Sequence, residues 1–400
     1  MKKILVLILM GLVLLSFMAG CFGDSTNNSN RSSSNDSGES GNVVRIGVFE
    51  PQSGDNGAGG KQEILGMQFA NVQTPTVEIG GQTYTVRLEY ADNQSSNDKA
   101  PSAAQKLVSD GCSLVLGSYG SSVSIAASDV FGDAGIPVIG VTCTNPAVTV
   151  GNSHYFRICF LDPFQGPVLA NFAKDEFKAT KAYCLAKLGD DYSVGLCNYF
   201  MEAFGRENCV YETFPDGTSD YSTYITNAKT SGAGVFFSPV STEAAALIID
   251  QAATQGLTIP VLAGDTWDSN VILNAAKDKD INVYVTTFYQ EGGDLTFDSG
   301  IKQWINSDST AKSNNGGDDK VAAVSAMGYD AYYVALEALK AAGSTKPADV
   351  LKALPDTTYT GVSGAISFDD IGDAIRDVAY VKRCNPTAGE WEFVAQQGVK

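Results

Sequence analysis

The chain has 400 residues, 27 basic and 45 acidic side chains, and a formal net charge of −18 at pH 7. A chain this acidic will not bind nucleic-acid phosphates or an anionic membrane surface through bulk charge. Its length exceeds what one hydrophobic core usually supports, so we expect the globular part to form two lobes.

The first residues have the pattern of an export signal. Two lysines follow Met1, and the apolar run Ile4–Leu15 leads through small residues to Cys21. A plain secretory signal and a membrane span are the alternatives. The run is short for a span, and polar residues rather than a stop-transfer pattern follow it. We expect residues 1–20 to be removed as a signal peptide.

The segment Ser16–Cys21 resembles the lipobox of bacterial lipoproteins, in which a cysteine receives a diacylglyceryl thioether and becomes the first mature residue. The resemblance implies that Cys21 is the lipid attachment site. The protein would then be held outside the cytoplasmic membrane, on its outer face or in the periplasm. Residues 21–42 are mostly Ser, Asn and Gly, and they are predicted to form a disordered linker with a reach of roughly 25 Å.

Cysteine and histidine usage gives little support for a metal site. Seven cysteines follow Cys21, no CxxC pair occurs, and His154 is the only histidine. Buried free thiols account for most of these cysteines, one disulfide is the alternative, and sequence alone does not give the pairing. We expect no metal and no cofactor.

Beyond the linker, short apolar runs alternate with longer amphipathic runs, which is typical of strands connected by helices. The first series is predicted as strand Val43–Phe49, helix Lys61–Ala70, strand Tyr84–Tyr90, helix Asp98–Ser109, strand Ser113–Leu116, helix Ser122–Ala134 and strand Pro137–Val141.

A second series begins after Tyr155–Phe160, and its first helix, Gly166–Phe177, has Pro167 near its first position. It continues with strand Ala182–Ala186, helix Ser193–Glu207, strand Cys209–Phe214, helix Tyr221–Ser231, strand Gly234–Phe237, helix Thr242–Gln255, strand Pro260–Ala263, helix Ser269–Ala276 and strand Ile281–Thr286. The last predicted elements are helix Val321–Ala342 and strands near Ala365–Phe368, Ala379–Lys382 and Glu392–Ala395. The alternation predicts two doubly wound α/β lobes with parallel sheets, in which ligands bind beyond the carboxyl ends of the strands.

Two loops that follow predicted strands carry candidate binding groups. Gly117–Ser124 opens a helix, where free N–H groups and serine hydroxyls suit a small carboxylate. Ordinary N-capping by Ser121 or Ser122 accounts for the same residues. Thr142–Pro146 offers carbonyls and hydroxyls that can accept from an ammonium group or donate to a carboxylate. Neither loop alone distinguishes a binding site from a turn.

Several segments, taken together and in order, resemble one family. They are Ser113–Pro146, Tyr155–Pro167, Asp191–Leu196 and Leu262–Ser269. The family is that of the extracytoplasmic solute-binding proteins of the branched-chain amino acid type, which deliver ligands to ABC transporters. The likeness extends from Val43 to about Val394.

The resemblance implies the type I periplasmic-binding-protein fold, two doubly wound parallel-sheet lobes joined by three crossovers. The crossovers would lie near Cys159–Pro163, Thr286–Gln290 and Gly372–Ile375. Lobe 1 would then combine residues 43–160 with 290–372, and lobe 2 would combine 163–286 with 376–400.

The resemblance also implies a set of ligand-binding residues. Ser121 would bind the α-carboxylate of the ligand, and Thr144 would contribute its hydroxyl and N–H to the same end. The carbonyl of Thr142 would accept from the ammonium group. From the other lobe, Asp265 would pair with the ammonium and Tyr192 would close over the ligand. Acid facing ammonium and hydroxyls facing carboxylate make charge-assisted bonds, so a zwitterion fits.

Some of these residues could instead serve only the fold. Asp265 could be an N-cap or turn residue, and Tyr192 could serve interlobe packing. Tyr119, Ser122 and Trp267 are further candidates for ligand contact. Trp267 is either a lid on the pocket or a surface anchor.

The expected function is capture of an amino acid (branched-chain, aromatic or another small zwitterion) and its delivery to an ABC transporter permease. No catalytic residues and no enzymatic activity are expected, because neither a GxSxG elbow nor a metal-ligand cluster occurs. The alternatives are a sensing module for a separate membrane receptor, or binding of another small solute such as an amide or nucleobase. Gly59 and Val240 depart from relatives that have aromatic residues there, which leaves the ligand side chain open.

Overall fold

The computed structural model describes residues 41–398, which belong to one compact unit. The predicted signal peptide, Cys21 and nearly all of the predicted linker lie outside the described residues. Asn42, the last residue of that linker, is the first residue of strand β1. Within residues 41–398, no helix combines the length and apolar character needed to cross a membrane.

The first of two large sheets has the strand order β2-β3-β1-β4-β5-β6. Neighbouring strands are parallel except β2, which pairs antiparallel with β3. The sequence analysis did not predict β2, so its expectation of a purely parallel sheet is wrong at this edge. The strands are β1 (Asn42–Glu50), β2 (Thr76–Ile79), β3 (Gln82–Asp92), β4 (Leu114–Leu116), β5 (Val138–Gly140) and β6 (Tyr155–Arg157).

The second large sheet has the order β15-β14-β11-β10-β9-β7-β8. It is parallel from β8 to β11, whereas β14 pairs antiparallel with β11, and β15 pairs antiparallel with β14. Because the last two strands form a hairpin, no helix crosses back between them. The strands are β7 (Ala182–Lys187), β8 (Cys209–Phe214), β9 (Val235–Phe237), β10 (Val261–Ala263), β11 (Val283–Thr287), β14 (Ala379–Asn385) and β15 (Glu390–Gln397).

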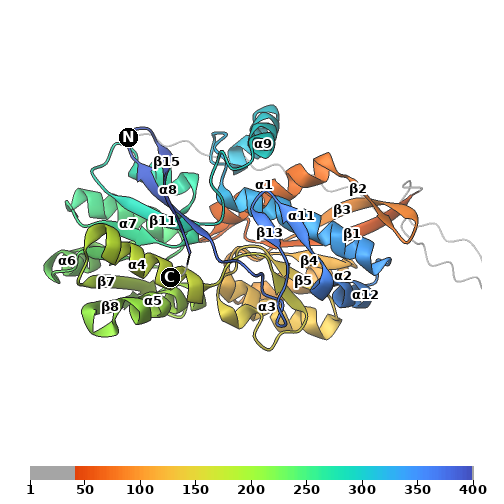
Figure 1. Cartoon of the computed structure of the whole chain (residues 1–400), viewed down its shortest axis with the longest axis horizontal. Coiled ribbons are helices and arrows are strands. Elements are labelled where there is room, and N and C mark those ends of the chain that lie inside the picture. The colour runs from red at the N-terminus through yellow and green to blue at the C-terminus, as the bar shows by residue number, and fades with distance from the viewer. Residues whose placement is uncertain (1–40, 399–400) are drawn as a thin grey trace, which may run out of the picture. The chain divides into compact units, whose positions relative to one another are not determined.

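We call the part of the molecule built on β1–β6 the first lobe and the part built on β7–β11, β14 and β15 the second lobe (Figure 1). The chain passes between the sheets three times: after β6, after β11 and before β14. The predicted fold class, two doubly wound α/β lobes joined by three crossovers, is confirmed. The residue limits assigned to each lobe stay a prediction.

Helices cover both sheets. Those around the first sheet are α1 (Gly57–Gln73), α2 (Ala100–Ser109), α3 (Ser121–Ala134), α9 (Leu295–Ser307), α10 (Ser309–Asn314), α11 (Ala323–Ala342) and α12 (Pro347–Ala353). Those around the second sheet are α4 (Asp162–Phe177), α5 (Asp191–Phe204), α6 (Ser222–Thr230), α7 (Thr242–Thr254) and α8 (Asn270–Ala276). A small sheet pairs β12 (Tyr359–Gly361) with β13 (Gly364–Ile366).

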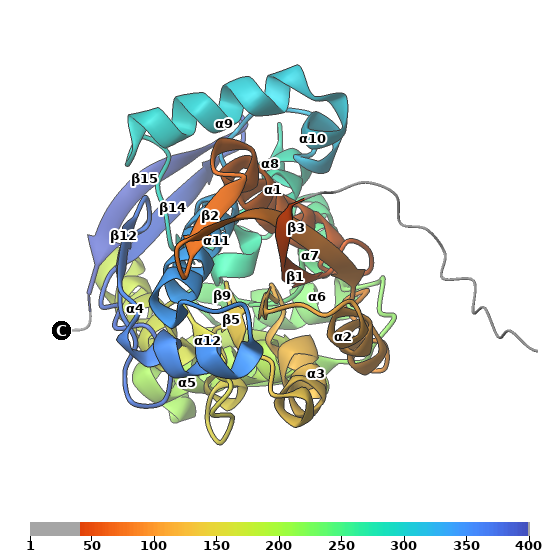
Figure 2. The ribbon, with the colours of Figure 1, turned by 90° about the vertical axis from the view of Figure 1, so that its right-hand side faces the viewer.

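The sequence analysis missed α9, α10, α12 and β12. In Figure 2, α9 and α10 lie at the top of the first lobe, beyond α1. Asp294 caps α9 by accepting from the N–H groups of Thr296 and Phe297 at 2.9 Å. Phe297, Ile301 and Ile305 of α9 are buried at helical spacing. The N-cap and this spacing are signals that could have found the helix.

Helix α4 begins earlier than expected. It starts at Asp162, so that Pro163 occupies the first turn and Pro167 lies inside the helix. Pro163 fits the first turn because its missing N–H would have had no partner there. The N–H of Asp162, the first residue of the helix, has no acceptor within the helix, and it donates to the carbonyl of Thr144 at 3.0 Å. The start of α4 is therefore fixed to a loop of the first lobe.

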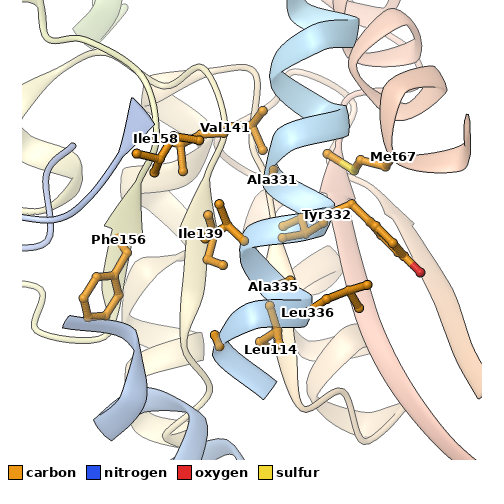
Figure 3. Close-up of a cluster of buried hydrophobic side chains, with 14 of the residues drawn as sticks. Met67, Leu114, Ile139, Val141, Phe156, Ile158, Ala331, Tyr332, Ala335 and Leu336 are labelled. Carbon is orange, nitrogen blue, oxygen red and sulfur yellow. The ribbon is translucent and has the colours of Figure 1, made fainter. Parts of the chain in front are cut away.

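The core of the first lobe forms where α11 packs on the sheet. Figure 3 shows Ala331 and Ala335 of α11 facing Ile139 of β5 and Leu114 of β4. Small alanine side chains let the helix approach the strands closely. Burying these apolar side chains stabilises the lobe by roughly 25 cal/mol per Å² of apolar surface removed from water. This packing fixes the strands whose carboxyl ends carry the candidate binding loops.

The seven cysteines after Cys21 are free thiols in the structure, and six of them are buried. Free thiols are thus the arrangement that the described residues show. Cys143, between two candidate site residues, is fully buried, and burial raises the pKa of its thiol to about 11.

Candidate functional site

The candidate site lies where the strand order of each sheet reverses direction. In the first sheet, β3 lies on one side of β1 and β4 on the other. Glu50 is the last residue of β1, and the Gly117–Ser121 loop follows the carboxyl end of β4 beside it. In the second sheet, β8 and β9 flank β7 in the same way. Such switch points are the usual ligand crevices of open α/β sheets.

A cleft of about 390 Å³ opens between the two lobes. Its walls come from the loops that follow the strands at both switch points. Four of the candidates, Tyr119, Ser121, Ser122 and Tyr192, line this cleft. Lys187 and Thr266 of the second lobe also line it.

Ser121 and Ser122 begin α3 without capping it through their side chains. The helix has Gly120 as its N-cap residue, with no side-chain cap hydrogen bond. The Ser121 hydroxyl accepts from the N–H of Asn145 at 3.2 Å. Ser122 donates to Asp190 Oδ1 at 2.9 Å and accepts from a backbone N–H of the second lobe. The N-capping alternative is therefore wrong for both serines, and Ser122 connects the lobes.

The loop after β5 places both candidate threonines in the interior. The Thr142 hydroxyl donates to Glu63 Oε2 at 2.5 Å. The Thr144 hydroxyl is buried beside the Asp162 carboxyl, with which it hydrogen-bonds. Neither threonine is among the residues that line the cleft. Ligand contact therefore stays a prediction for Thr142 and Thr144.

Arg157 holds this loop in place. Its guanidinium donates to the carbonyl of Cys143 at 2.9 Å and to that of Asn145 at 2.5 Å. The same group pairs with Asp373 Oδ1 at 2.5 Å, and both side chains are almost fully buried. Asp373 belongs to the chain segment that leads toward β14. The sequence analysis did not single out Arg157, although a charged residue within an apolar strand is a signal for a buried ion pair.

Tyr192 and Asp265 form one hydrogen-bonded unit in the second lobe. The Tyr192 hydroxyl donates to Asp265 Oδ1 at 3.0 Å, and Gln165 Nε2 donates to the same oxygen at 2.9 Å. Asp265 is 2% exposed, and burial raises the pKa of its carboxyl to about 6. Ser269 is the N-cap residue of α8, so the alternative of Asp265 as an N-cap is wrong. Asp265 begins the short 3₁₀ helix Asp265–Trp267, which fits the alternative of a turn residue before α8.

Tyr119 crosses the cleft. Its hydroxyl donates to the carbonyl of Thr266 in the second lobe at 2.9 Å. Its ring lies against Gly59, where an added Cβ would be 2.4 Å from the Tyr119 Cζ. The absence of an aromatic side chain at Gly59 is thus matched by an aromatic ring that reaches the same place from another loop.

Trp267 does not lie at the surface. It is 0% exposed, packs in the hydrophobic core of the second lobe, and donates from Nε1 to the carbonyl of Val240 at 3.0 Å. The surface-anchor alternative is wrong, because the ring fills a core position between β10 and its neighbours. Contact with a ligand stays a prediction for Trp267.

The structure also brings buried acids to the site that the sequence analysis did not name. Glu50 accepts from the N–H of Tyr119 at 2.7 Å. Burial, and then the charge of Glu63, raise the pKa of Glu50 well above its usual range. Burial raises the pKa of Glu63 to about 7 and that of Asp162 to about 8. Glu50 ends β1 at the switch point, which is the signal that could have found it.

His154 contacts helix α3 rather than any of the candidate ligand-binding residues. Its Nε2 lies 3.2 Å from the Ser128 hydroxyl and 3.0 Å from the Ser128 carbonyl. Across residues 41–398, no group of three or more His, Cys, Asp or Glu side chains has an arrangement that could hold a metal ion.

Comparison with known proteins gives consistent matches. The family model described as periplasmic binding protein matches residues 43–387. The Leu/Ile/Val-binding protein homolog 1 of Brucella abortus (strain 2308) is 30% identical over 338 residues, covering 82% of this chain and 87% of that protein.

Solved structures agree with this match. The leucine binding protein LivK of Thermotoga maritima superposes with a TM-score of 0.76 at 29% identity, covering 89% of this chain and 99% of that one. LivJ of Streptococcus pneumoniae, solved in complex with isoleucine, gives a TM-score of 0.75 at 23% identity, again over 89% and 99% of the two chains. At that identity the second likeness supports the fold alone.

Proposed function

This chain belongs to the periplasmic binding protein family, and from that premise we propose that it captures a small zwitterionic amino acid between its lobes. The observation that carries the proposal is the division of polar groups across the cleft. The first lobe lines the cleft with the Ser121 hydroxyl. The second lobe lines it with Tyr192, whose hydroxyl donates to the buried Asp265 carboxyl.

The proposed binding mode follows from these groups. The ligand carboxylate accepts from Ser121, from Thr144 and from the free N–H groups at the start of α3. Asp265 and the Thr142 carbonyl accept from the ammonium. Since a charged hydrogen bond is stronger than a neutral one, opposite charges at the two ends orient the ligand.

Closure of the lobes is the proposed signal to the transporter. A ligand that touches both lobes stabilises the closed arrangement by its differential affinity for it. The bonds from Tyr119 to Thr266 and from Ser122 to Asp190 join the two lobes across the cleft. An ABC transporter permease would read the closed form and receive the ligand.

The proposed role is binding rather than catalysis, and the proposed location is the outer side of the cell membrane with a lipid on Cys21. The protein's family supports the extracytoplasmic location. The signal pattern and the lipobox resemblance support the anchor.

The test is a thermal-shift and calorimetric panel of the twenty amino acids against the purified chain. At least one amino acid should raise the melting temperature, because a ligand that binds only the folded state adds RT ln(1 + [L]/Kd) to its stability. A panel without any response would overturn the amino-acid assignment. Mass spectrometry of small molecules released on denaturation gives a second, independent readout.

A further inference from the structure

Cys209 is the most accessible thiol of the described chain. Of the seven cysteines after Cys21, it alone is not buried. It is the first residue of β8, which forms an edge of the second sheet. Because an edge strand has a neighbouring strand on one side only, a solute reaches Cys209 more readily than it reaches the six buried thiols.

A second thiol, that of Cys184 on β7, lies beside Cys209 on the same face of the sheet. In the pairing of β7 with β8, Ala182 is opposite Cys209 and Cys184 is opposite Tyr211. Because residues two apart on a strand share a face, Cys184 and Cys209 are diagonal neighbours. Both pack in the hydrophobic cluster between this face and the helices that cover it, where Cys184 is fully buried and Cys209 partly buried. An accessible thiol thus contacts a buried one.

The two thiols form a short chain of hydrogen bonds that ends at the backbone. The Cys184 S–H donates to the Cys209 sulfur. The Cys209 thiol, when protonated, donates to the carbonyl of Gly205 at 3.4 Å. The bond from Cys184 lowers the pKa of the Cys209 thiol, and the charges of Arg206 and Lys174 outside the pair act in the same direction. Burial raises the pKa of Cys184 well above its usual range, so Cys209 supplies the thiolate and Cys184 keeps its proton.

Neither a metal nor the ligand cleft accounts for this pair. Structural zinc sites bind four ligands, and within residues 41–398 no group of three or more His, Cys, Asp or Glu side chains could hold a metal ion. Neither Cys184 nor Cys209 lines the cleft. An accessible thiol of lowered pKa beside a second cysteine is the arrangement of redox-sensitive sites, in which the second cysteine resolves the oxidised form of the first.

We propose that Cys209 and Cys184 are a redox-sensitive pair, which hydrogen peroxide converts to a disulfide. The Cys209 thiolate attacks one peroxide oxygen and the O–O bond breaks. The sulfur is oxidised to a sulfenic acid, and the departing hydroxide takes up the proton that Cys209 had lost and becomes water. The Cys184 sulfur then attacks the sulfenic sulfur. The S–S bond forms, the S–O bond breaks, and the departing hydroxide leaves as water with the proton of Cys184. Two thiols and one hydrogen peroxide thus give one disulfide and two waters.

Closure of the disulfide requires a small movement at the start of β8. The Cα atoms of a disulfide usually lie about 4.4–6.8 Å apart, whereas diagonal neighbours on adjacent strands are about 7–8 Å apart. Cys209 directly follows the short 3₁₀ helix Arg206–Asn208, and Gly205 precedes that helix with a φ of 103°. This turn at the end of an edge strand is a place where the backbone can adjust, since only one strand holds β8.

The first part of the experiment ranks the thiols of the reduced full chain. Iodoacetamide is added at pH 7.5, and mass spectrometry of the peptides follows the labelling of each cysteine with time. Cys209 should be alkylated at least about tenfold faster than any buried cysteine, because both its access and its thiolate fraction are greater. Labelling of Cys209 at the rate of Cys112, a buried thiol of the first lobe, would overturn the proposal.

The second part treats the reduced protein with hydrogen peroxide, blocks the remaining thiols with N-ethylmaleimide and maps the peptides without reduction. We expect one disulfide, between Cys184 and Cys209, which dithiothreitol reverses. In Cys184→Ser the reaction should stop at the sulfenic acid, so that dimedone labels Cys209. Cys209→Ser should form no disulfide. Cys197→Ser is the matched control, since Cys197 of α5 is a buried thiol of the same cluster, and it should form the same disulfide as the wild type.

The peptide map of the wild type decides the proposal even if a variant does not fold, which circular dichroism checks. A reversible disulfide between Cys184 and Cys209 supports it. A disulfide from Cys209 to Cys197 or to a second molecule would overturn it, as would a Cys209 that oxidises to a sulfinic acid while Cys184 stays reduced. The absence of any reaction at Cys209 would overturn it as well.

Discussion

The Lys187 ammonium of the second lobe lies 2.7 Å from the Asp55 carboxylate of the first lobe. Lys187 also contacts Asp216 of its own lobe at 2.7 Å. The three side chains line the mouth of the cleft. This ion pair joins the two lobes at the wall of the cleft, so it depends on how the lobes are arranged rather than on either lobe alone.

Asp55→Asn should therefore weaken ligand binding a few-fold and raise the ligand dissociation rate. The two side chains are partly exposed, and ion pairs of this kind contribute about 0.2–1 kcal/mol to the stability of the arrangement that they join. Stopped-flow fluorescence measures the rate, and added salt should reduce the difference between variant and wild type. Asp110→Asn, which breaks an exposed pair between Lys106 in the last turn of α2 and the C-cap residue Asp110, is the control. Equal effects of the two substitutions would contradict an interlobe role for Lys187.

Asp265→Asn should lower the affinity for a zwitterionic ligand by about ten- to a hundredfold, because it removes the acceptor charge for the ammonium. The melting temperature of the protein without ligand should stay the same or rise, since a buried carboxylate that pairs with no cation is unfavourable. Calorimetry and thermal unfolding check the two parts. Asp250→Asn alters an exposed acid of the same lobe and should affect neither. An unchanged affinity would remove Asp265 from the site.

Stability of the ligand-free protein should fall as the pH rises from about 4 to 8. The pKa values of Asp265, Glu63 and Asp162 are raised to about 6, 7 and 8, whereas free carboxyls titrate near 4. In this window the folded protein keeps protons that the unfolded chain releases, so acidification favours folding. Thermal unfolding at a series of pH values measures the trend.

His154 provides the internal control for that trend. Burial lowers the pKa of its imidazole, so His154 destabilises the fold on acidification, the opposite direction. His154→Gln should therefore steepen the gain in stability at low pH, and Glu63→Gln should reduce it. A melting temperature that rises with pH in the wild type and in the His154→Gln variant would contradict the titration of the buried acids.

Arg157→Met should destabilise the protein by about 3–5 kcal/mol, because it leaves the buried Asp373 carboxylate without its partner. Urea unfolding measures the loss. The double variant Arg157→Met with Asp373→Asn should recover part of it, since no unpaired charge remains. A double variant that is less stable than the single one would contradict the cost of the unpaired charge and would show that Asp373 stabilises the fold through its bond from Thr149.

Cys21→Ser should release the protein from the membrane fraction into the soluble exported fraction, because the thioether can form only at the cysteine sulfur. Fractionation with immunodetection measures the distribution. Cys112→Ser, a substitution of a buried thiol in the globular part, is the control. Retention of the Cys21 variant in the membrane would contradict the lipid anchor.

Sequence reasoning located elements whose signals are local. The strand expected at Ser113–Leu116 and the helix expected at Ser122–Ala134 follow from an apolar run and a small-residue turn. The structure has them at Leu114–Leu116 and Ser121–Ala134. The antiparallel strand β2 and the early start of α4 depend on partners far away in the chain. Asp162, for example, begins α4 while donating to the Thr144 carbonyl, and no local pattern shows that bond.

The same limit applies to the site. Ser121 and Asp265 could be named as candidates because they follow strands and match a family pattern, and their contact with a ligand stays a prediction. Glu50 and Glu63 could not be recognised as a pair, since one ends a strand and the other lies on α1. An acid in a sequence is by default a solvated surface residue, and only the fold reveals that both are fully buried.

One guanidinium, that of Arg157, bonds both to the loop that carries Thr142 and Thr144 and to Asp373 on the third passage between the lobes. A substitution that loosened this passage would also shift the loop that carries Thr142 and Thr144. Under the proposed binding mode, the stiffness of the hinge and the choice of ligand are therefore coupled. Evolution toward a new solute has to act on the opposite wall, or change both traits at once.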